Sequence, residues 1–204
     1  MIAIRPALPD ATDAPAFANL ADIASAHLYH AVLGRRSQTL LDGMFRLEGN
    51  HFSHRHVRFI TLDGEIAGMI CGLSSADAQI HARRHSLLLL RFLSWRLPLV
   101  LARCWPLRRL GEFVSQTHEG HFYVPFLAVY EKFRGRGFGL KLMAAAETMA
   151  REAGCSTLAL SADPTDPIAL RIYQKFGMSA IRSSPTVRFR GRDETLQRME
   201  KPLA

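Results

Sequence analysis

The chain has 204 residues, which is long enough for one domain with a buried core and no supporting disulfide or metal. Its 48% hydrophobic and 22% charged residues exclude the disordered, collagen-like and disulfide-scaffold classes. The formal net charge of +8 favours anionic partners such as nucleic acid, acidic lipid or a phosphorylated ligand, unless it is only generic surface charge.

The cysteines and the apolar stretches indicate a reducing, cytoplasmic setting. The three cysteines lie far apart without a C-x-x-C pair, so neither a structural zinc site nor a redox motif is expected. Residues 1–17 lack the basic and apolar regions of a signal peptide. The most apolar stretch, Leu87 to Trp105, is interrupted by three arginines and Pro98, so it is too polar for a membrane span.

The first half of the chain predicts a strand, two helices and a hairpin. Met1 to Arg5 alternates like a short strand, Asp10 to Leu33 has apolar residues at helical spacing, and Thr39 to Leu47 predicts a shorter helix. Two β-rich runs follow, His56 to Leu62 and Ile66 to Leu73. The Asp63-Gly64 pair between them is typical of a tight hairpin turn.

The segment from Ser75 to Gln116 has an unusual composition of leucine and arginine. We expect Pro98 and Pro106 to divide it into short helical pieces. It could lie on an anionic membrane as a basic amphipathic segment, or bind an acidic substrate. We favour a lid or dimer contact whose leucines pack on the sheet while the arginines are solvated, and we expect it to form a wall of the ligand site.

The second half predicts alternating strands and helices that complete one mixed α/β domain over residues 1–204. Pro125 within the strand His121 to Val129 indicates a sheet edge or a bulge. A helix follows from Gly137 to Ala153, and a second begins at Asp166-Pro167 and ends at Gly177. The second helix is expected to bury Ala169, Ile172 and Phe176. The remaining strands are expected at Thr157–Ser161, Met178–Ile181 and Thr186–Arg190, with Leu196–Met199 extending the last.

A glycine loop joins the strand His121 to Val129 to the next helix. Its glycines at 135, 137 and 139 let the backbone turn sharply, and its amides lie at a helix N-terminus, where an anion is favoured. Arg134 and Arg136 add fork-shaped donors for phosphate oxygens. A diphosphate is therefore the expected ligand, although neither the Walker pattern nor the dinucleotide fingerprint matches this loop.

Two motifs in the right order resemble those of the GNAT superfamily, the GCN5-related N-acetyltransferases. Arg134, Gly137 and Gly139 match its [Q/R]-x-x-G-x-[G/A] motif, after a strand that ends in Leu127-x-Val129. Its second signature, N-x-x-A-x-x-x-Y-x-x-x-G-[F/M], matches from residue 166 to residue 178, with Asp166 where asparagine is usual. The resemblance covers roughly the last 85 residues well.

The resemblance implies a GNAT fold, with a mixed sheet that is splayed at its centre and flanked by helices, and acetyl-CoA as the co-substrate. By this analogy Leu127 and Val129 hydrogen-bond the pantetheine amides, and a strand amide near Val129 stabilises the oxyanion formed when a neutral amine attacks directly. Asp166 and Ala169 lie against the cofactor, and Tyr173 donates a proton to the departing thiolate. The pyrophosphate is implied to bind at the loop amides, namely Gly135, Arg136, Gly137, Phe138, Gly139 and Leu140.

The resemblance leaves the general base open. His121, Tyr123, Glu119 and, further out, His118 are the candidates around the central strand. Two groups of histidines elsewhere fit no standard zinc pattern, so we expect solvated side chains and no metal there; these are His51, His54 and His56, and His81 with His85.

The leading function is transfer of acetyl from acetyl-CoA to an amine of a small molecule or a peptide. The alternative is a non-catalytic acyl-CoA-binding module that senses or mediates an interaction. Nucleic-acid binding through the basic segment is a third, less favoured reading, because no recognition motif accompanies it. An exposed apolar segment 75–116 would also allow a homodimer.

Overall fold

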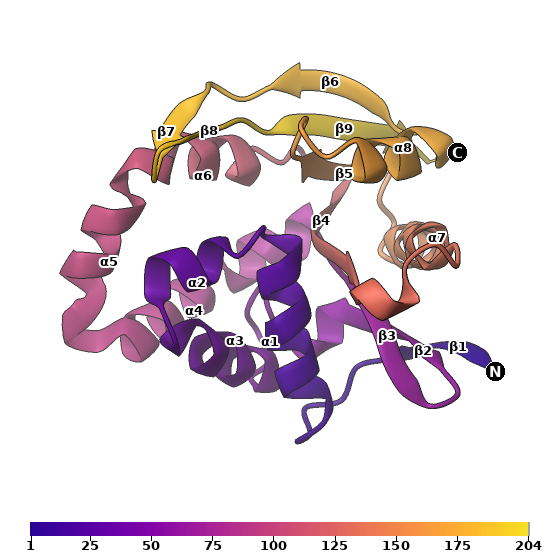
Figure 1. Ribbon diagram of the computed structural model, residues 1–204, viewed down its shortest axis with the longest axis horizontal. Coiled ribbons are helices and arrows are strands. Elements are labelled where there is room, and N and C mark those ends of the chain that lie inside the picture. Colours follow the sequence, from indigo (N-terminus) through magenta and orange to yellow (C-terminus); the bar gives the residue numbers. More distant parts are fainter. Residues whose placement is uncertain (204) are drawn as a thin grey trace.

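A seven-stranded sheet runs through the centre of the molecule in the order β1-β2-β3-β4-β5-β9-β6 (Figure 1). The computed structural model describes residues 1–203. Strands β4 and β5 are parallel, and every other neighbouring pair in this sheet is antiparallel. The strands are β1 (Ile2–Pro6), β2 (Val57–Leu62), β3 (Glu65–Ser74), β4 (His121–Val129), β5 (Thr157–Ala162), β6 (Ser179–Ser183) and β9 (Gln197–Pro202). A separate hairpin consists of β7 (Val187–Phe189) and β8 (Arg192–Glu194).

Helices cover both faces of the sheet, and each face has its own core. Helices α7 (Phe138–Glu152) and α8 (Pro167–Lys175) pack on one face, around Leu142, Leu158 and Met199. The opposite face carries a second core of α1 (Asp13–Ala24), α3 (Arg36–Arg46) and part of α4 (Ser75–Leu93). The remaining helices on this side are α2 (Leu28–Leu33), α5 (Leu97–Cys104) and α6 (Arg108–Ser115). The expected mixed α/β architecture is confirmed.

Local signals predict several elements to within a residue or two. The β2–β3 hairpin turns at Asp63-Gly64, both with positive φ (50° and 86°), as a primed turn requires. Strand β4 has the predicted bounds. Helix α7 lies one residue inside the predicted range at each end.

The predicted helix from Asp10 to Leu33 is wrong as a single element, because the chain breaks between α1 and α2. Ala26 and His27 adopt left-handed φ values of 49° and 62°. The carboxylate of Asp22, which is nearly buried, accepts hydrogen bonds from the His30 amide at 3.0 Å and contacts His27 Nδ1 at 2.9 Å. This side chain therefore stabilises a turn where the apolar spacing alone predicts a continuous helix.

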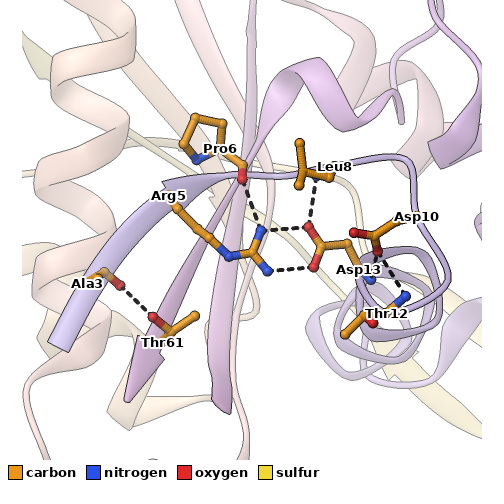
Figure 2. A network of polar contacts seen from close by, with 8 residues as sticks. All are labelled: Ala3, Arg5, Pro6, Leu8, Asp10, Thr12, Asp13 and Thr61. Atoms are coloured by element: carbon orange, nitrogen blue, oxygen red, sulfur yellow. Dashed lines mark hydrogen bonds and ion pairs between the residues drawn. The ribbon is translucent and has the colours of Figure 1, made fainter. Parts of the chain in front are cut away.

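A partly buried ion pair joins β1 to the start of α1 (Figure 2). The Arg5 guanidinium donates two hydrogen bonds to the Asp13 carboxylate, at 2.6 and 2.7 Å, and the Leu8 amide donates a third at 2.8 Å. Asp10 accepts from the amides of Thr12 and Asp13, so it satisfies donors at the first turn of α1. The Asp13 side chain is almost fully buried, and these contacts compensate its charge.

The segment from Ser75 to Gln116 forms an arc rather than only short pieces. Its first helix, α4, is 19 residues long, so the expectation of short pieces holds only for α5 and α6. Pro98 and Pro106 stand at the beginnings of α5 and of the following 3-10 turn, where a missing N–H costs no helical bond. In Figure 1 this arc runs from behind α2 and α3, along the left side through α5, to α6 beneath β7 and β8.

The C-terminal strand also differs from the prediction. Leu196 to Met199 does not extend the preceding strand, because β9 enters the main sheet between β5 and β6. Met199 is buried in the core on the α7 face, while Arg198 is buried on the opposite face. A strand that buries both faces belongs in the interior of a sheet rather than at its edge.

Candidate active site

Strands β4 and β5 separate halfway along their length. They are paired only from His121 to Val124 on β4 and from Thr157 to Leu160 on β5. Beyond this point β4 remains paired with β3 as far as Val129, and β5 remains paired with β9 as far as Ala162. The sheet therefore opens into a wedge between two parallel strands, and Pro125 stands where it begins (Figure 1).

A β-bulge at the same place changes which side chains face each core. The four residues of β4 from Tyr123 to Phe126 lie opposite only three residues of β3, from Cys71 to Leu73, so β4 holds one extra residue. Before the bulge, Phe122 and Val124 pack in the α7 core. After it, Phe126 packs in the α1 core on the opposite face.

The bulge also determines which backbone groups of β4 face the wedge. The Tyr130 amide donates to the Ala67 carbonyl at 2.9 Å, so Tyr130 directs its backbone towards β3. Because successive residues of a strand alternate, we infer that Leu127 and Val129 direct their N–H and C=O groups into the wedge. The Val129 carbonyl accepts from Arg134 Nε at 3.3 Å, which agrees with this orientation.

The glycine loop at the start of α7 presents a run of unpaired backbone amides. Gly135 and Gly137 have φ values of 77° and 74°, and a Cβ added to either would meet nothing within 4 Å. Helix α7 begins at Phe138, so its first amides have no helical acceptor. Within residues 1–203 none of the amides from 135 to 140 donates to a protein acceptor. The arrangement matches the phosphate site expected at a helix N-terminus.

The side chains of the loop have separate roles. Arg134 and Arg136 are exposed, and the Arg136 guanidinium lies 5.8 Å from the Phe133 ring centroid. The Phe138 side chain is buried in the core, so only its backbone can reach a ligand. A Cβ at Gly139 would lie 3.2 Å from the Ile172 side chain, so this glycine lets α7 and α8 approach closely.

Helix α8 begins at the predicted cap. The Asp166 carboxylate accepts from the amides of Ile168 and Ala169, at 3.0 and 2.9 Å. The prediction that this helix buries its apolar face is wrong, because Ala169, Ile172 and Phe176 are only partly buried. We attribute this to the wedge, since the divergence of β4 from β5 leaves part of α8 without a strand to pack on.

The phenol of Tyr173 is suited to donate a proton. Burial, together with the nearby Asp166 and Tyr123, raises the pKa of Tyr173 to about 12. The hydroxyl therefore remains protonated at neutral pH. Tyr123, on β4 just before the wedge, is near enough to contribute to this shift.

A buried arginine, which sequence reasoning missed, lies beside Tyr123. Arg198 is 1% exposed, and its guanidinium lies 4.9 Å from the Tyr123 ring centroid. Its Nη2 donates to three carbonyls at the C-terminal end of α6, while Nε and Nη1 have no protein partner within residues 1–203. Burial lowers the pKa of Arg198. The only signal of this burial in the sequence is the position of Arg198 beside Met199. Neighbouring strand residues face opposite sides, so a strand that buries Met199 on one face directs Arg198 towards the other.

The other candidate bases lie further from the wedge. His121 stands three residues before the last paired residue of β4, roughly 10 Å along the strand. Burial lowers the pKa of His121, and its Nδ1 lies 4.0 Å from the Glu200 carboxylate. His118 and Glu119 are exposed in the turn that precedes β4.

The two groups of histidines come together, and the expectation that they are solvated is wrong. The His51 ring stacks on the His85 ring at 4.2 Å, and the His56 and His81 ring centroids are 5.7 Å apart. Burial lowers the pKa of both His56 and His85 to about 4. Among the described residues, no group of three or more His, Cys, Asp or Glu side chains is arranged to hold a metal ion. No helix in residues 1–203 has the length and apolar character needed to cross a membrane.

Comparisons with known proteins agree with this geometry. Residues 24–178 match the model of the acetyltransferase (GNAT) family. A 73-residue stretch is 41% identical to the acetyltransferase Atu2258 of Agrobacterium fabrum, covering 36% of this chain and about half (52%) of that relative.

Solved structures share the fold at low sequence identity. An N-acetyltransferase from Staphylococcus aureus Mu50 superposes with a TM-score of 0.67 at 15% identity, over 98% of this chain and 100% of its own. The yncA protein of Salmonella typhimurium, solved with its cofactor acetyl-CoA, gives 0.63 at 14% identity, over 100% and 94% of the two chains. The ribosomal-protein-S18-alanine N-acetyltransferase of Escherichia coli gives 0.57 at 15% identity, over 100% and 95%.

Proposed function

Because the chain belongs to the GNAT acetyltransferase family, whose members use acetyl-CoA, we propose that it transfers an acetyl group from acetyl-CoA to a primary amine of a small molecule or peptide. The observation that carries this proposal is the alignment of the wedge with the glycine loop. Leu127 and Val129 return to the α7 face after the bulge, and α7 begins with the unpaired loop amides. A long ligand with an anionic end and an amide-containing arm fits both at once.

The binding roles follow from this alignment. The pantetheine arm would take the place of a strand beside Leu127 and Val129, whose backbone groups are directed away from β3. The pyrophosphate would accept from the amides of residues 135 to 140, with Arg134 and Arg136 adding positive charge. Arg134 would have to exchange its contact with the Val129 carbonyl for this role. Asp166 and Ala169 would border the arm at the start of α8.

Acetyl-CoA supplies an activated thioester, so the chain itself has to orient the acceptor and move protons. Tyr173 would donate a proton to the departing sulfur, because its raised pKa keeps the phenol protonated at neutral pH. A strand amide near Val129 would hold developing negative charge on the acyl oxygen, a contribution of about 3 kcal/mol in comparable sites.

The acceptor amine has to lose a proton, and Tyr123 is the candidate nearest the wedge. Burial raises the pKa of Tyr123, although the neighbouring Arg198 opposes this effect. His121 could act only through bridging water, given its distance along β4. The choice between them is a matter for the experiment below.

The experiment measures release of CoA thiol from acetyl-CoA with pools of amines, polyamines, amino acids and peptides. Release that depends on one pool is expected, and Tyr173→Phe should lower kcat by about 10²-fold while calorimetric CoA binding is retained. Tyr29→Phe, in the core on the opposite face, is the matched control and should leave kcat unchanged. A pH profile of Tyr123→Phe against His121→Gln identifies the base.

The alternative is a non-catalytic acyl-CoA-binding module that senses CoA or mediates an interaction. It predicts CoA binding by calorimetry without thiol release from any pool, and no difference between the wild type and Tyr173→Phe. That result would refute the transferase and leave the binding site intact.

A further inference from the structure

The arc from Ser75 to Gln116 carries most of the net charge of the protein. It contains seven arginines, no lysine and two acidic residues, Asp77 and Glu112, so it accounts for five of the eight net positive charges. Its central part, from Ala78 to Gly111, contains all seven arginines and no acidic residue. The arginines are Arg83, Arg84, Arg91, Arg96, Arg103, Arg108 and Arg109. Arg83, Arg91 and Arg109 make no ion pair or side-chain hydrogen bond within residues 1–203, so their charges are free for an outside partner.

The same arc exposes large apolar side chains. Seven of the fifteen exposed large hydrophobic residues in residues 1–203 lie here, namely Ile80, Leu87, Leu90, Trp95, Leu99, Leu101 and Trp105. Ile80, Arg83, Leu87 and Leu90 follow a 3-4-3 spacing on α4, so they form one stripe of the helix. The inward residues of α4, such as Leu88 and Phe92, pack against the α1 core. The exposed stripe is therefore the side of α4 that the protein leaves uncovered.

Two exposed tryptophans extend this surface beyond α4. Trp95 and Trp105 are 76% and 69% exposed, and Arg96 and Arg108 lie over their rings at 4.8 and 5.1 Å. Trp105 also borders a hollow of about 300 Å³, lined on the arc side by Arg108 and Arg109 and on the β7 side by Arg188. Each tryptophan thus stands beside cationic groups, and one stands beside a hollow suited to an anionic group.

We propose that this surface, defined by Ile80, Leu87, Leu90, Trp95, Leu99 and Trp105 with the surrounding arginines, docks on an anionic phospholipid bilayer. A bilayer interface offers both chemistries at once, with phosphates for the arginines and acyl chains for the apolar side chains. Tryptophan favours this boundary because its ring is apolar and its N–H is polar. A second copy of the chain fits less well, since it would oppose one set of seven arginines, of which only Arg108 is ion-paired within residues 1–203, with seven more. Nucleic acid would use the charges but not the leucine stripe.

The two tryptophans are the only ones in the chain, so the native protein reports on this surface by its own fluorescence. The experiment titrates the full chain with phosphatidylcholine vesicles containing about 30 mol% phosphatidylglycerol, with and without brominated acyl chains. The expected result is a blue shift of the emission, quenching by the brominated lipid, and little binding to pure phosphatidylcholine. Binding without bromine quenching would overturn the proposal, because the apolar stripe would then have no role.

Paired variants test the surface without touching the acetyl-CoA site. Arg83→Gln with Arg91→Gln should weaken vesicle binding about 30-fold, at about 1 kcal/mol for each arginine near an anionic surface. The matched control removes the same charge elsewhere, with Arg55→Gln and Arg151→Gln on the 3-10 turn before β2 and on α7. An equal loss in the control would refute the docking surface, as would a self-associating species in sedimentation that shields both tryptophans without lipid.

Duplex DNA, as a competitor of the vesicles, tests whether the surface binds any polyanion. If DNA at physiological salt displaces the protein from the vesicles and shields the tryptophans equally well, the surface binds polyanions in general and the proposal is wrong. The acetyl-transfer assay is independent of this result, so failure of one proposal leaves the other intact.

Discussion

Acidification should destabilise this protein through two partly buried histidines. His56 and His85 each have a pKa lowered from the ordinary value of 6.5 to about 4, with burial as the largest cause. His85 Nδ1 accepts a hydrogen bond from the His51 amide at 3.3 Å, so protonation of this nitrogen would also remove an acceptor. The His51 ring, stacked on His85, contacts the Ala78 carbonyl at 2.9 Å. These contacts hold the first half of α4 against the loop before β2.

The direction and size of the effect follow from proton linkage. The folded-state pKa lies below the unfolded value, so the unfolded chain binds more protons between about pH 4 and 6.5. The stability contributed by the neutral histidines is therefore complete above pH 6.5 and is lost as the pH falls towards 4. Between about pH 7.5 and pH 5 each histidine should lower the free energy of unfolding by about 2 kcal/mol, or about 4 kcal/mol together. This is a large part of the 5–15 kcal/mol typical of a domain.

Urea denaturation at about pH 7.5, 6 and 5 measures how the free energy of unfolding depends on pH. Carboxylates that titrate at lower pH also contribute, so the decisive quantity is the difference between the wild type and His85→Gln. The variant should lose about 2 kcal/mol less over the same interval, whatever its stability at pH 7.5. The exposed His118→Gln serves as the control and should keep the wild-type slope. An unfolding free energy that is flat to pH 5, or a His85→Gln variant with the full slope, would refute the reasoning.

Removal of the buried Asp13 carboxylate by Asp13→Ala should destabilise the protein by about 1–3 kcal/mol, because the Leu8 amide and Arg5 lose their acceptor while the partly exposed Arg5 can still be solvated; thermal denaturation measures this. Asp166→Ala should cost about 1 kcal/mol through the lost cap of α8, whereas Asp166→Asn should cost little, a contrast that urea denaturation resolves. Gly137→Ala should lower the free energy of unfolding by about 1–2 kcal/mol, because its φ of 74° strains an L-residue. Calorimetry should also show that this variant binds CoA more weakly than the control Gly111→Ala does. A Cβ at Gly111 likewise meets nothing within 4 Å.

The elements that the sequence predicts well are those with a local physical cause. Asp63-Gly64 requires a primed turn wherever it lies between two β-rich runs, and Asp166 before Pro167 caps a helix whatever packs against it. The same applies to the glycine loop, whose positive φ values and open Cβ positions are properties of the backbone itself. The candidate site was predictable to this extent because the loop proposed to bind the pyrophosphate is a local motif.

The features that the sequence does not predict depend on contacts between distant residues. The break after α1 depends on the buried carboxylate of Asp22, which apolar spacing does not report. His51 and His85 come from separate motifs and meet only when α4 folds back. Arg198 is one of many basic residues in the sequence, and only the insertion of β9 beneath α6 gives it a buried position beside Tyr123.

Pro125 connects the local and the distant parts of the site. A proline cannot donate to a ladder, so β5 gains nothing by following β4 past this residue, and the strands can part there. The bulge at the same place adds one residue to β4 and turns Leu127 and Val129 towards the α7 face, where the glycine loop begins. Without the bulge, the unpaired stretch of β4 would present the opposite set of side chains to α7. The opening of the sheet and its alignment with the loop are therefore two consequences of one irregularity in β4.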